Sequence, residues 1–323
     1  MKTIFLVVPC YNEQEVLPET SKRLKEKMLS LREKGMISDD SRVIFVDDGS
    51  KDQTWEIISR YHAEEPMLFD GIKLSRNEGH QNALFAGLMK ARPLCDAAIS
   101  LDADLQDDIN AIDEMVQKFE EGYDIVYGVR SQRDTDTAFK RMTAQGFYKV
   151  MAFMGVEVVY DHADYRLMSQ RALDGLADFR EVNLFLRGIV PMIGYKSTKV
   201  YYARAERFAG ESKYPLKKML SFAAQGITSL SVKPIRMITT LGIGIFGVSI
   251  LILIYSLIRH FTGHTIAGWT SLAVSVWAIG GLQLLAIGVI GEYIGKIYLE
   301  TKRRPRFVID ATVGGLDMIC DRQ

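Results

Sequence analysis

Three clusters of acidic and polar residues each follow a short apolar segment of the chain. They span Pro9–Glu13, Asp47–Ser50 and Asp102–Gln106. Ligands of open α/β sheets bind beyond the carboxyl ends of the strands. If the apolar segments are neighbouring strands, the three clusters meet at one edge of a sheet. Charges that served only solubility would be scattered, so this grouping predicts a ligand site at that edge.

The pair Asp102 and Asp104 could bind a divalent cation. Residues two apart on an extended segment point to the same side, and Mg²⁺ is usually held by one or two carboxylates together with water and substrate phosphates. An Asp-x-Asp pair is common by chance and carries little weight alone. An EF-hand is excluded, because the sixth and twelfth positions of its calcium loop would be Asp107 and Asp113 instead of Gly and Glu.

The cluster Asp47–Ser50 allows two interpretations. Asp and Gly favour turns, and a carboxylate at the same place could instead accept a hydrogen bond from a ribose hydroxyl or a base N–H. The first apolar segment is not followed by Gly-x-Gly-x-x-Gly, and the chain contains no Gly-Lys-Ser or Gly-Lys-Thr. Dinucleotide-binding and P-loop sites are therefore excluded.

Apolar segments alternate with stretches of helical spacing in the N-terminal part of the chain. This alternation predicts a mostly parallel sheet flanked by helices. The expected strands are Ile4–Val8, Val43–Val46, Gly71–Leu74, Ala97–Leu101 and Asp124–Val129. The expected helices are Asn12–Leu31, Thr54–Tyr61, Asn82–Met89 and Ile109–Phe119.

Composition excludes several other classes of protein. Lys plus Arg and Asp plus Glu each number 40, whereas nucleic-acid binders normally carry a basic excess. A hydrophobic content of 48% and a charged content of 25% exclude intrinsic disorder. Cys10, Cys95 and Cys320 are too few and too far apart for a disulfide scaffold or a four-thiolate zinc site. Reduced cysteines are typical of a part that faces the cytoplasm.

Two long segments contain no charged residue, Ile238–Ile258 and Ile266–Gly291. Each exceeds the roughly 20 residues that a helix needs to cross a bilayer. Two buried helices of a soluble protein are the alternative, but such helices rarely avoid charge on every face for this length. The sequence therefore predicts a hairpin of two membrane-spanning helices.

Basic residues flank the predicted hairpin on both outer sides, whereas the loop between its spans has only Arg259. They are Lys213, Lys217, Lys218, Lys233 and Arg236 before it, and Lys296, Lys302, Arg303, Arg304 and Arg306 after it. The positive-inside rule then places both chain ends in the cytoplasm. The first residues lack the long apolar region and cleavage site of a signal peptide.

The stretch before the first span has helical periodicity. Its apolar residues fall on one face: Leu216, Met219, Leu220, Ala223, Ile227 and Leu230. We expect interfacial amphipathic helices at 214–235, although a core helix of the soluble part would show the same periodicity. The complete expected layout is a catalytic domain at 1–213, these helices, two transmembrane helices within 236–295, and a cytoplasmic tail at 296–323.

The ordered motifs of the chain resemble those of family 2 glycosyltransferases. They are Val8–Glu13, Val46–Asp52, Ser75–His80, Leu101–Gln106, Asp164–Met168 and Arg207–Tyr214. The pattern is similar to the polyprenyl-phosphate branch, which includes dolichol-phosphate mannose synthases and bacterial bactoprenol glucosyltransferases. The two spans followed by Gly291–Lys296 resemble the bacterial members, and the likeness covers nearly the whole chain.

This resemblance implies a GT-A fold and an inverting transfer of a sugar from a nucleotide-sugar to polyprenyl (undecaprenyl) phosphate. UDP-glucose is the favoured donor because it is common in that branch, and Mg²⁺ or Mn²⁺ is the implied cofactor. The implied location is the bacterial inner membrane, with a multi-pass chain, a cytoplasmic catalytic domain and a homo-oligomeric state. Nucleic acid is not an expected partner.

The resemblance also implies site residues. Those facing the nucleotide-sugar are Pro9, Tyr11, Glu13, Asp48, Asp102, Ala103, Asp104, Gln106, Arg207 and Lys213, with Asp102 and Asp104 as metal ligands. The acceptor phosphate is assigned to Arg130 and to Arg141, with Lys140 as an equal alternative to the latter. Asp164 matches an aspartate often assigned as the base, with Asp104 and Arg207 as the other catalytic residues.

The role of Asp164 has more than one interpretation. An acceptor phosphate is already largely ionised at neutral pH, because its second pKa is near ~6. Asp164 could therefore orient a substrate instead of removing a proton, or merely cap a helix.

Two other functions share parts of this pattern. A processive polysaccharide synthase needs Gln-x-x-Arg-Trp, and Trp55, Trp269 and Trp277 all lack that context. A non-catalytic GT-A membrane scaffold would be expected to lose one of the residues carried over above, and all are present.

Overall fold

The computed structural model describes residues 1–130, 154, 162–182, 184–203, 231–261 and 269–318. The chain forms two compact units. The first comprises Met1–Tyr148, Glu157–Pro215 and Arg304–Gln323, and the second comprises Lys149–Val156 and Leu216–Arg303.

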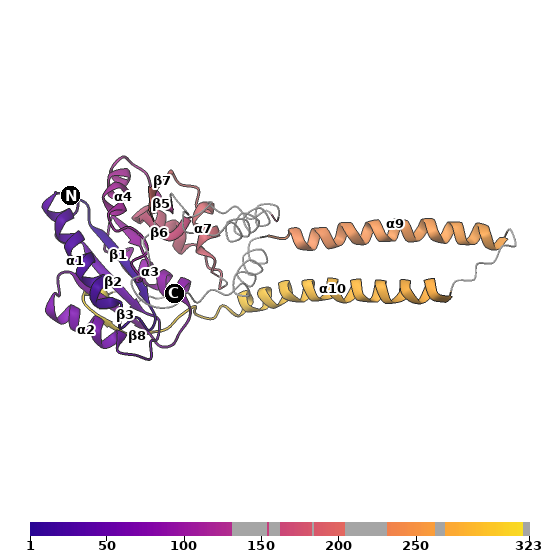
Figure 1. Cartoon of the computed structure of the whole chain (residues 1–323), viewed down its shortest axis with the longest axis horizontal. Helices are drawn as coiled ribbons and strands as arrows, with labels where there is room; N and C mark the ends of the chain where they lie inside the picture. The colour runs from indigo at the N-terminus through magenta and orange to yellow at the C-terminus, as the bar shows by residue number, and fades with distance from the viewer. Residues whose placement is uncertain (131–153, 155–161, 183, 204–230, 262–268, 319–323) are drawn as a thin grey trace. The chain divides into compact units, whose positions relative to one another are not determined.

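Within the described residues, the first unit contains a sheet of eight strands in the order β7-β5-β6-β4-β1-β2-β3-β8 (Figure 1). The strands are β1 (Ile4–Cys10), β2 (Arg42–Asp47), β3 (Phe69–Leu74), β4 (Ala97–Ser100), β5 (Ile125–Arg130), β6 (His162–Ser169), β7 (Ser197–Tyr202) and β8 (Ile309–Val313). The centre of the sheet is parallel, since β1 pairs with β2 and β4, and β2 pairs with β3. β6 runs antiparallel to β4 and β5, and β8 runs antiparallel to β3.

Helices cover both faces of this sheet. They are α1 (Leu17–Glu33), α2 (Thr54–Glu64), α3 (His80–Ala91), α4 (Ala111–Glu120), α6 (Gln170–Ala177) and α7 (Leu186–Met192). Strand β1 shows how the two cores are divided. Ile4, Leu6 and Val8 pack with α1, α2 and α4, whereas Phe5 and Val7 pack with α3, α6 and α7. This is the two-residue alternation of a strand buried on both sides.

The predicted strands and helices up to residue 129 are present, with shifted ends. The first helix begins at Leu17, later than the expected Asn12, because residues 11–16 form turns. The antiparallel strands β6 and β8 were not predicted. They make the sheet mixed, while its centre is parallel as expected.

Helix α3 approaches the sheet unusually closely because it has Gly87 where it crosses β1 and β2. A Cβ atom at this position would lie 2.4 Å from Val7 Cγ1 and 2.7 Å from Val46 Cγ2. The close contact holds α3 so that its first residue, His80, lies near the carboxyl ends of the parallel strands.

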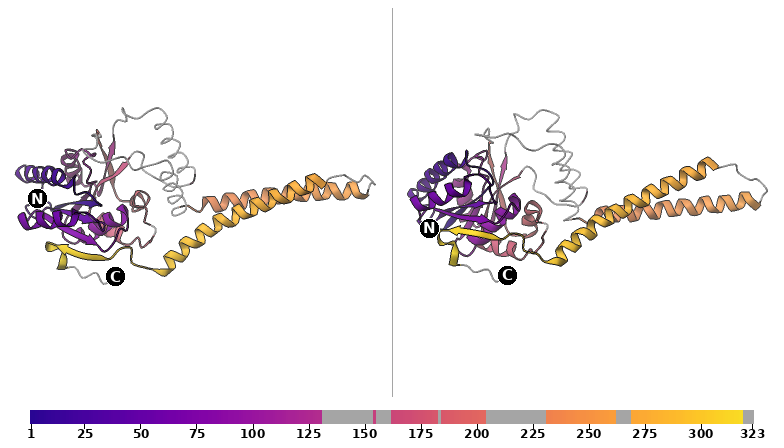
Figure 2. Two further views of the ribbon diagram at one scale, coloured as in Figure 1. Left: turned by 60° about the horizontal axis from the view of Figure 1, so that its bottom comes forward. Right: turned by 90° about the horizontal axis from the view of Figure 1, so that it is seen from below.

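The C-terminal segment returns to the sheet of the first unit. After α10 ends at Lys302, β8 pairs with β3, and the short 3₁₀ helix η1 (Gly315–Met318) buries Leu316 completely (Figure 2). Gly314 adopts φ +102°, and a Cβ there would collide with the Asp70 carboxylate. The expected tail at 296–323 is therefore part helix and part sheet in the structure.

The second unit contains two long helices, α9 (Lys233–Phe261) and α10 (Trp269–Lys302), which run antiparallel beside each other (Figures 1 and 2). The uncharged segment Ile238–Ile258 lies within α9, and most of Ile266–Gly291 lies within α10. Large apolar side chains are exposed along both helices, among them Leu241, Ile243, Leu251, Ile254, Leu272, Val276, Leu284 and Ile287. Tyr293 of α10 donates a hydrogen bond to the Ser231 carbonyl before α9 (2.6 Å).

Among the described residues, one helical segment, Ile279–Lys302, is long and apolar enough to cross a membrane by length and composition, with a mean hydropathy of 1.4. The predicted amphipathic stretch 214–230 lies outside the described residues. A Cβ added at Gly242, Gly244 or Gly247 would meet no described atom within 4 Å, so these glycines are not at a packed contact here.

Candidate active site

The polar clusters that follow β1 and β2 are joined by hydrogen bonds. The parallel register places Cys10 beside Asp47, so the chain leaves both strands at the same edge. The Asn12 amide N–H donates to Ser50 Oγ (2.9 Å), and the Lys51 N–H donates to Asn12 Oδ1 (2.9 Å). Two of the predicted clusters therefore meet as expected.

The residues of the first polar cluster, Pro9–Glu13, differ in their exposure and in their contacts. Pro9 is still part of the β1 ladder, opposite Val46. Tyr11 is 41% exposed. The Glu13 N–H donates to Thr54 Oγ1 at the start of α2 (2.9 Å).

Asp48 organises the loop after β3. Its carboxylate is buried and accepts hydrogen bonds from the main-chain N–H groups of Glu78 (2.7 Å) and Gly79 (2.9 Å). Burial raises the pKa of Asp48 above its ordinary value, against the lowering effect of these two bonds. Gly49 makes the close approach possible, because its φ is +65° and a Cβ would lie 2.5 Å from the Arg76 carbonyl carbon. Asp48, which is predicted to contact the nucleoside, thus also fixes the main chain of residues 76–79.

The Asp102–Gln106 segment follows β4 and turns at Ala103 and Asp104, and Leu105 adopts a positive φ of +57°. Leu101, Ala103 and Leu105 are buried, whereas Asp102, Asp104 and Gln106 are partly exposed. The buried Ala103 carbonyl accepts a hydrogen bond from Thr20 Oγ1 (2.7 Å), which fixes the segment to α1. Both carboxylates are partly exposed, although the segment turns here and is not the extended stretch that the two-residue spacing assumed.

The same two carboxylates suit a divalent cation. The pKa of Asp102 is raised to about 6 by partial burial and by the negative charges of Asp107, Asp164 and Asp104, although His80 lowers it. A cation would relieve this repulsion. Among the described residues, no three His, Cys, Asp or Glu side chains form a complete metal-binding group. The two aspartates fit a metal that takes its other ligands from water and substrate phosphates.

Asp164, on β6, is a buried carboxylate surrounded by cations. It accepts hydrogen bonds from the Arg166 guanidinium (2.6 Å) and the Arg187 guanidinium (3.0 Å). His80 Nε2 lies 3.7 Å from its Oδ2 and 3.5 Å from Asp102 Oδ1. Burial would raise the pKa of Asp164, but Arg187, His80 and Arg166 outweigh it and hold the pKa well below its usual range.

These contacts favour one of the two roles left open for Asp164. A general base works best when its pKa is near the operating pH, and a carboxylate with a strongly lowered pKa binds a proton poorly at neutral pH. Asp164 instead holds Arg166, Arg187 and His80 in fixed positions. The role of Asp164 as an orienting group is therefore part of the proposed function.

His80 and Arg187 were not among the predicted site residues. Burial lowers the pKa of His80, but the nearby carboxylates of Asp164 and Asp102 raise it to about 9, which favours the cationic imidazole at neutral pH. The Arg187 side chain is 31% exposed and comes from α7. His80 belongs to a quoted motif, which was a usable signal, whereas nothing in the sequence links Arg187 to Asp164.

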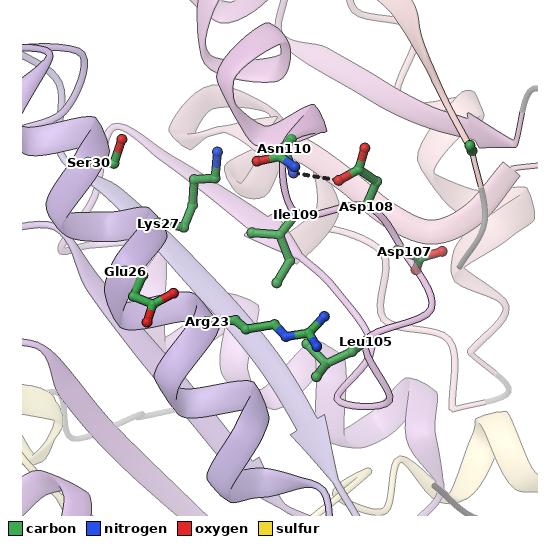
Figure 3. A pocket seen from close by; sticks show the side chains of 10 residues that line it. Arg23, Glu26, Lys27, Ser30, Leu105, Asp107, Asp108, Ile109 and Asn110 are labelled. Carbon is green, nitrogen blue, oxygen red and sulfur yellow. Dashed lines mark hydrogen bonds between the residues drawn. The ribbon is translucent and has the colours of Figure 1, made fainter. Parts of the chain in front are cut away.

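Arg130 ends β5 and forms a separate charged group. Its Nη2 donates to Asp107 Oδ1 (3.2 Å), which also accepts from the Tyr202 hydroxyl (2.5 Å). Asp107 borders an open pocket of about 530 Å³ between α1 and the segment 105–110, where Arg23 and Lys27 face it from α1 (Figure 3). The predicted residues Lys140, Arg141, Arg207 and Lys213 lie outside the described residues.

Comparison with known proteins places this site in a family. Residues 5–176 match the family model described as glycosyl transferase family 2. A Bacillus subtilis protein named uncharacterized glycosyltransferase YkoT is 55% identical over 305 residues, covering 94% of this chain and 90% of that one. The bactoprenol glucosyl transferase of Shigella phage SfV is 38% identical over 308 residues, covering 95% and 97%. The chain belongs to glycosyl transferase family 2, and it is a glycosyltransferase.

A solved structure, the mannosyltransferase PcManGT of Pyrobaculum calidifontis in complex with GDP-Man and Mn²⁺, aligns with 92% of this chain and 85% of its own. The identity is 17% and the TM-score 0.42. The family match and the helix-flanked mixed sheet confirm the predicted GT-A fold class and the predicted enzyme class.

We expect the substitution Asp164→Asn to destabilise the protein as well as to lower its turnover. Arg166 is buried next to Asp164, and removing one partner of a buried ion pair typically costs about 3–5 kcal/mol. Thermal unfolding of the purified protein should show a lowered midpoint. Asp174→Asn, which removes an exposed carboxylate on α6, should leave the midpoint unchanged. Lost turnover at an unchanged midpoint would instead assign Asp164 as a base.

Proposed function

We propose that this enzyme transfers a sugar from a nucleotide-sugar to polyprenyl phosphate, with inversion at the anomeric carbon. The observation that carries the proposal is the meeting of Asp48, Asp102 and Asp164 at one sheet edge, in a chain that bactoprenol glucosyl transferases match over nearly its whole length. UDP-glucose is the proposed donor and undecaprenyl phosphate the proposed acceptor.

Asp102 and Asp104 would hold Mg²⁺ or Mn²⁺ at this edge. When bound, the ion neutralises the charge that develops on the diphosphate leaving group. Arg207 is proposed to add positive charge at the same diphosphate, with Lys213 nearby. Tyr11, Glu13 and Asp48 are proposed to contact the base and ribose from the ends of β1 and β2.

The acceptor chemistry agrees with an ion-paired Asp164. A phosphate monoester is mostly ionised at neutral pH, so its oxygen can attack without a strong base. Arg187 and His80, held by Asp164, add positive charge where two anionic substrates would meet. Arg130, with Arg141 or Lys140, is proposed to bind the acceptor phosphate.

The apolar helices support a membrane location. β7 ends at Tyr202 and β8 begins at Ile309 in the same sheet, so the chain between them returns to the side it left and crosses a membrane an even number of times. If the segment Ile279–Lys302 crosses, a second crossing must precede it. The uncharged part of α9 is the proposed partner.

Charge distribution supports a cytoplasmic position for the catalytic unit. Lys233 and Arg236 precede the uncharged part of α9, and Lys302 and Arg303 end α10. Basic residues near membrane spans favour the cytoplasmic side. The proposed location is the bacterial inner membrane, with the polyprenyl phosphate acceptor in the same bilayer.

A panel of nucleotide-sugars tests the function directly. Purified full-length protein in detergent would be incubated with undecaprenyl phosphate, Mg²⁺ or Mn²⁺ and each donor in turn. We expect sugar transfer to the lipid from UDP-glucose. Transfer from another donor would replace glucose with that donor's sugar in the proposed reaction. Polymer formation, or no transfer from any donor, would contradict the proposed function.

Asp104→Asn should reduce transfer at least about 100-fold at saturating metal, because one charged ligand of the cation is lost. Binding of Mn²⁺ in the presence of UDP, followed by electron paramagnetic resonance, should weaken in parallel. Asp108→Asn, on the same loop, is the matched control and should bind Mn²⁺ normally. A variant at position 104 that kept more than a tenth of its activity would remove Asp104 from the metal site.

Arg130→Ala should raise the KM for the lipid phosphate far more than the KM for the donor. Its position at the end of β5, beside Asp107, motivates this expectation. Each substrate would be varied separately, with the exposed Arg171→Ala as control. Equal increases in both KM values would reassign Arg130 to the donor diphosphate.

A further inference from the structure

The segment that follows α10 contacts the loop between β3 and α3 and the helix α3 itself. We call residues 306–316 the C-terminal strap. The Arg306 guanidinium donates to the Phe179 carbonyl and lies 4.4 Å over the Phe85 ring, and the Phe307 ring lies 6.5 Å from the same ring. Phe85 is a buried residue of α3. The strap therefore packs on the helix that begins with His80.

The strap also fixes the beginning of the loop before α3. The Ser75 N–H donates to the Val308 carbonyl (2.9 Å), directly after the last β3–β8 pair. Further along, the Asp70 carboxylate of β3 accepts a hydrogen bond from the Gly315 N–H, and Leu316 is fully buried in the core that contains α3. The strap is thus attached at its start, middle and end.

The opposite side of the same loop and helix carries the candidate active site. The N–H groups of Glu78 and Gly79 hold the Asp48 carboxylate, and His80 lies between Asp102 and Asp164. Residues 75–85 therefore connect the strap to the proposed nucleoside and metal residues. No substrate need touch the strap for it to affect them.

We propose that the C-terminal strap is a positioning element that sets the geometry of the donor site through Ser75 and Phe85. This inference rests on the proposed function in so far as residues 48, 102 and 104 bind the donor. A strap that merely covered the β3 edge against aggregation would stabilise the sheet without any specific effect on the donor.

The test uses the full-length protein in detergent with both strap side chains shortened, Arg306→Ala together with Phe307→Ala. Val308→Ala and Asp310→Ala are matched controls, because both side chains are mostly exposed and both changes keep the main-chain pairing. Arg306→Gln alone is the milder variant if the double variant fails to fold.

Hydrogen exchange of the Glu78 and Gly79 amides is the first measurement. Exchange should become about tenfold faster in the strap variants and stay unchanged in the controls, while amides of β1 and β2 keep their protection. The second measurement separates the substrates. The KM for the nucleotide-sugar should rise about tenfold, and the KM for undecaprenyl phosphate should stay within about twofold.

Two results would overturn the proposal. One is unchanged exchange at Glu78 and Gly79 in the strap variants. The other is faster exchange across the whole sheet with equal loss for both substrates, which would make the strap a simple edge cover. The exchange measurement needs no substrate, so a wild-type protein that failed to bind UDP would contradict the proposed donor and leave the test of the strap intact.

Discussion

Negative charge gathered at one edge of the sheet is the constraint on which the rest of the site depends. Burial raises the pKa of Asp102, and the nearby charges of Asp107, Asp164 and Asp104 raise it further. Like charges at short range raise pKa values unless cations offset them. The negative charge of Asp164 is offset by two arginines, and that of Asp107 is offset by Arg130. Asp102 keeps a raised pKa, so an added cation would gain most there. Asp102, a predicted metal ligand, lies 3.5 Å from the His80 imidazole.

The parallel centre of the fold could be predicted because it depends on local patterns. Strands buried on both faces are short continuous apolar segments, and turn-forming acidic residues mark their carboxyl ends. The polar clusters after β1, β2 and β4 could therefore be predicted from the sequence. Two partners of Asp164 could not be predicted from spacing, because His80 begins α3 and Arg187 lies in the first turn of α7. Tertiary packing brings them together, and no spacing in the sequence records it.

The same limit applies to the end of the chain. Ile309–Val313 is a short strand after a long apolar helix, and its pairing partner lies more than two hundred residues earlier in β3. A basic stretch after a predicted span is typical of a tail, so composition favoured that interpretation. The decisive features are a glycine with positive φ at Gly314 and a buried carboxylate at Asp70. Neither residue indicates this strand pairing in the sequence, because the two come together only in the folded sheet.

Helix α3 joins these separate observations. Gly87 lets it lie close against β1 and β2, its first residue reaches the charged edge, and Phe85 faces the end of the chain. The middle of α3 is therefore closely packed against these strands, as protein interiors leave few voids. The interior packing of one helix thus links features that are distant in sequence.

The position of β8 in the chain also fixes the order in which a newly made molecule can be completed. β8 is synthesised after both long helices, so a nascent chain has an unpaired β3 edge until residues 309–313 leave the ribosome. Exposed strand edges recruit other strands, and translation at about 5–20 residues per second leaves that edge open for roughly 10–50 seconds. A chain released before residue 309 would lack its edge strand permanently, and quality-control proteases would meet it as an incomplete sheet. The hairpin has by then been made in every finished molecule, so only chains that have already produced both helices can close the sheet.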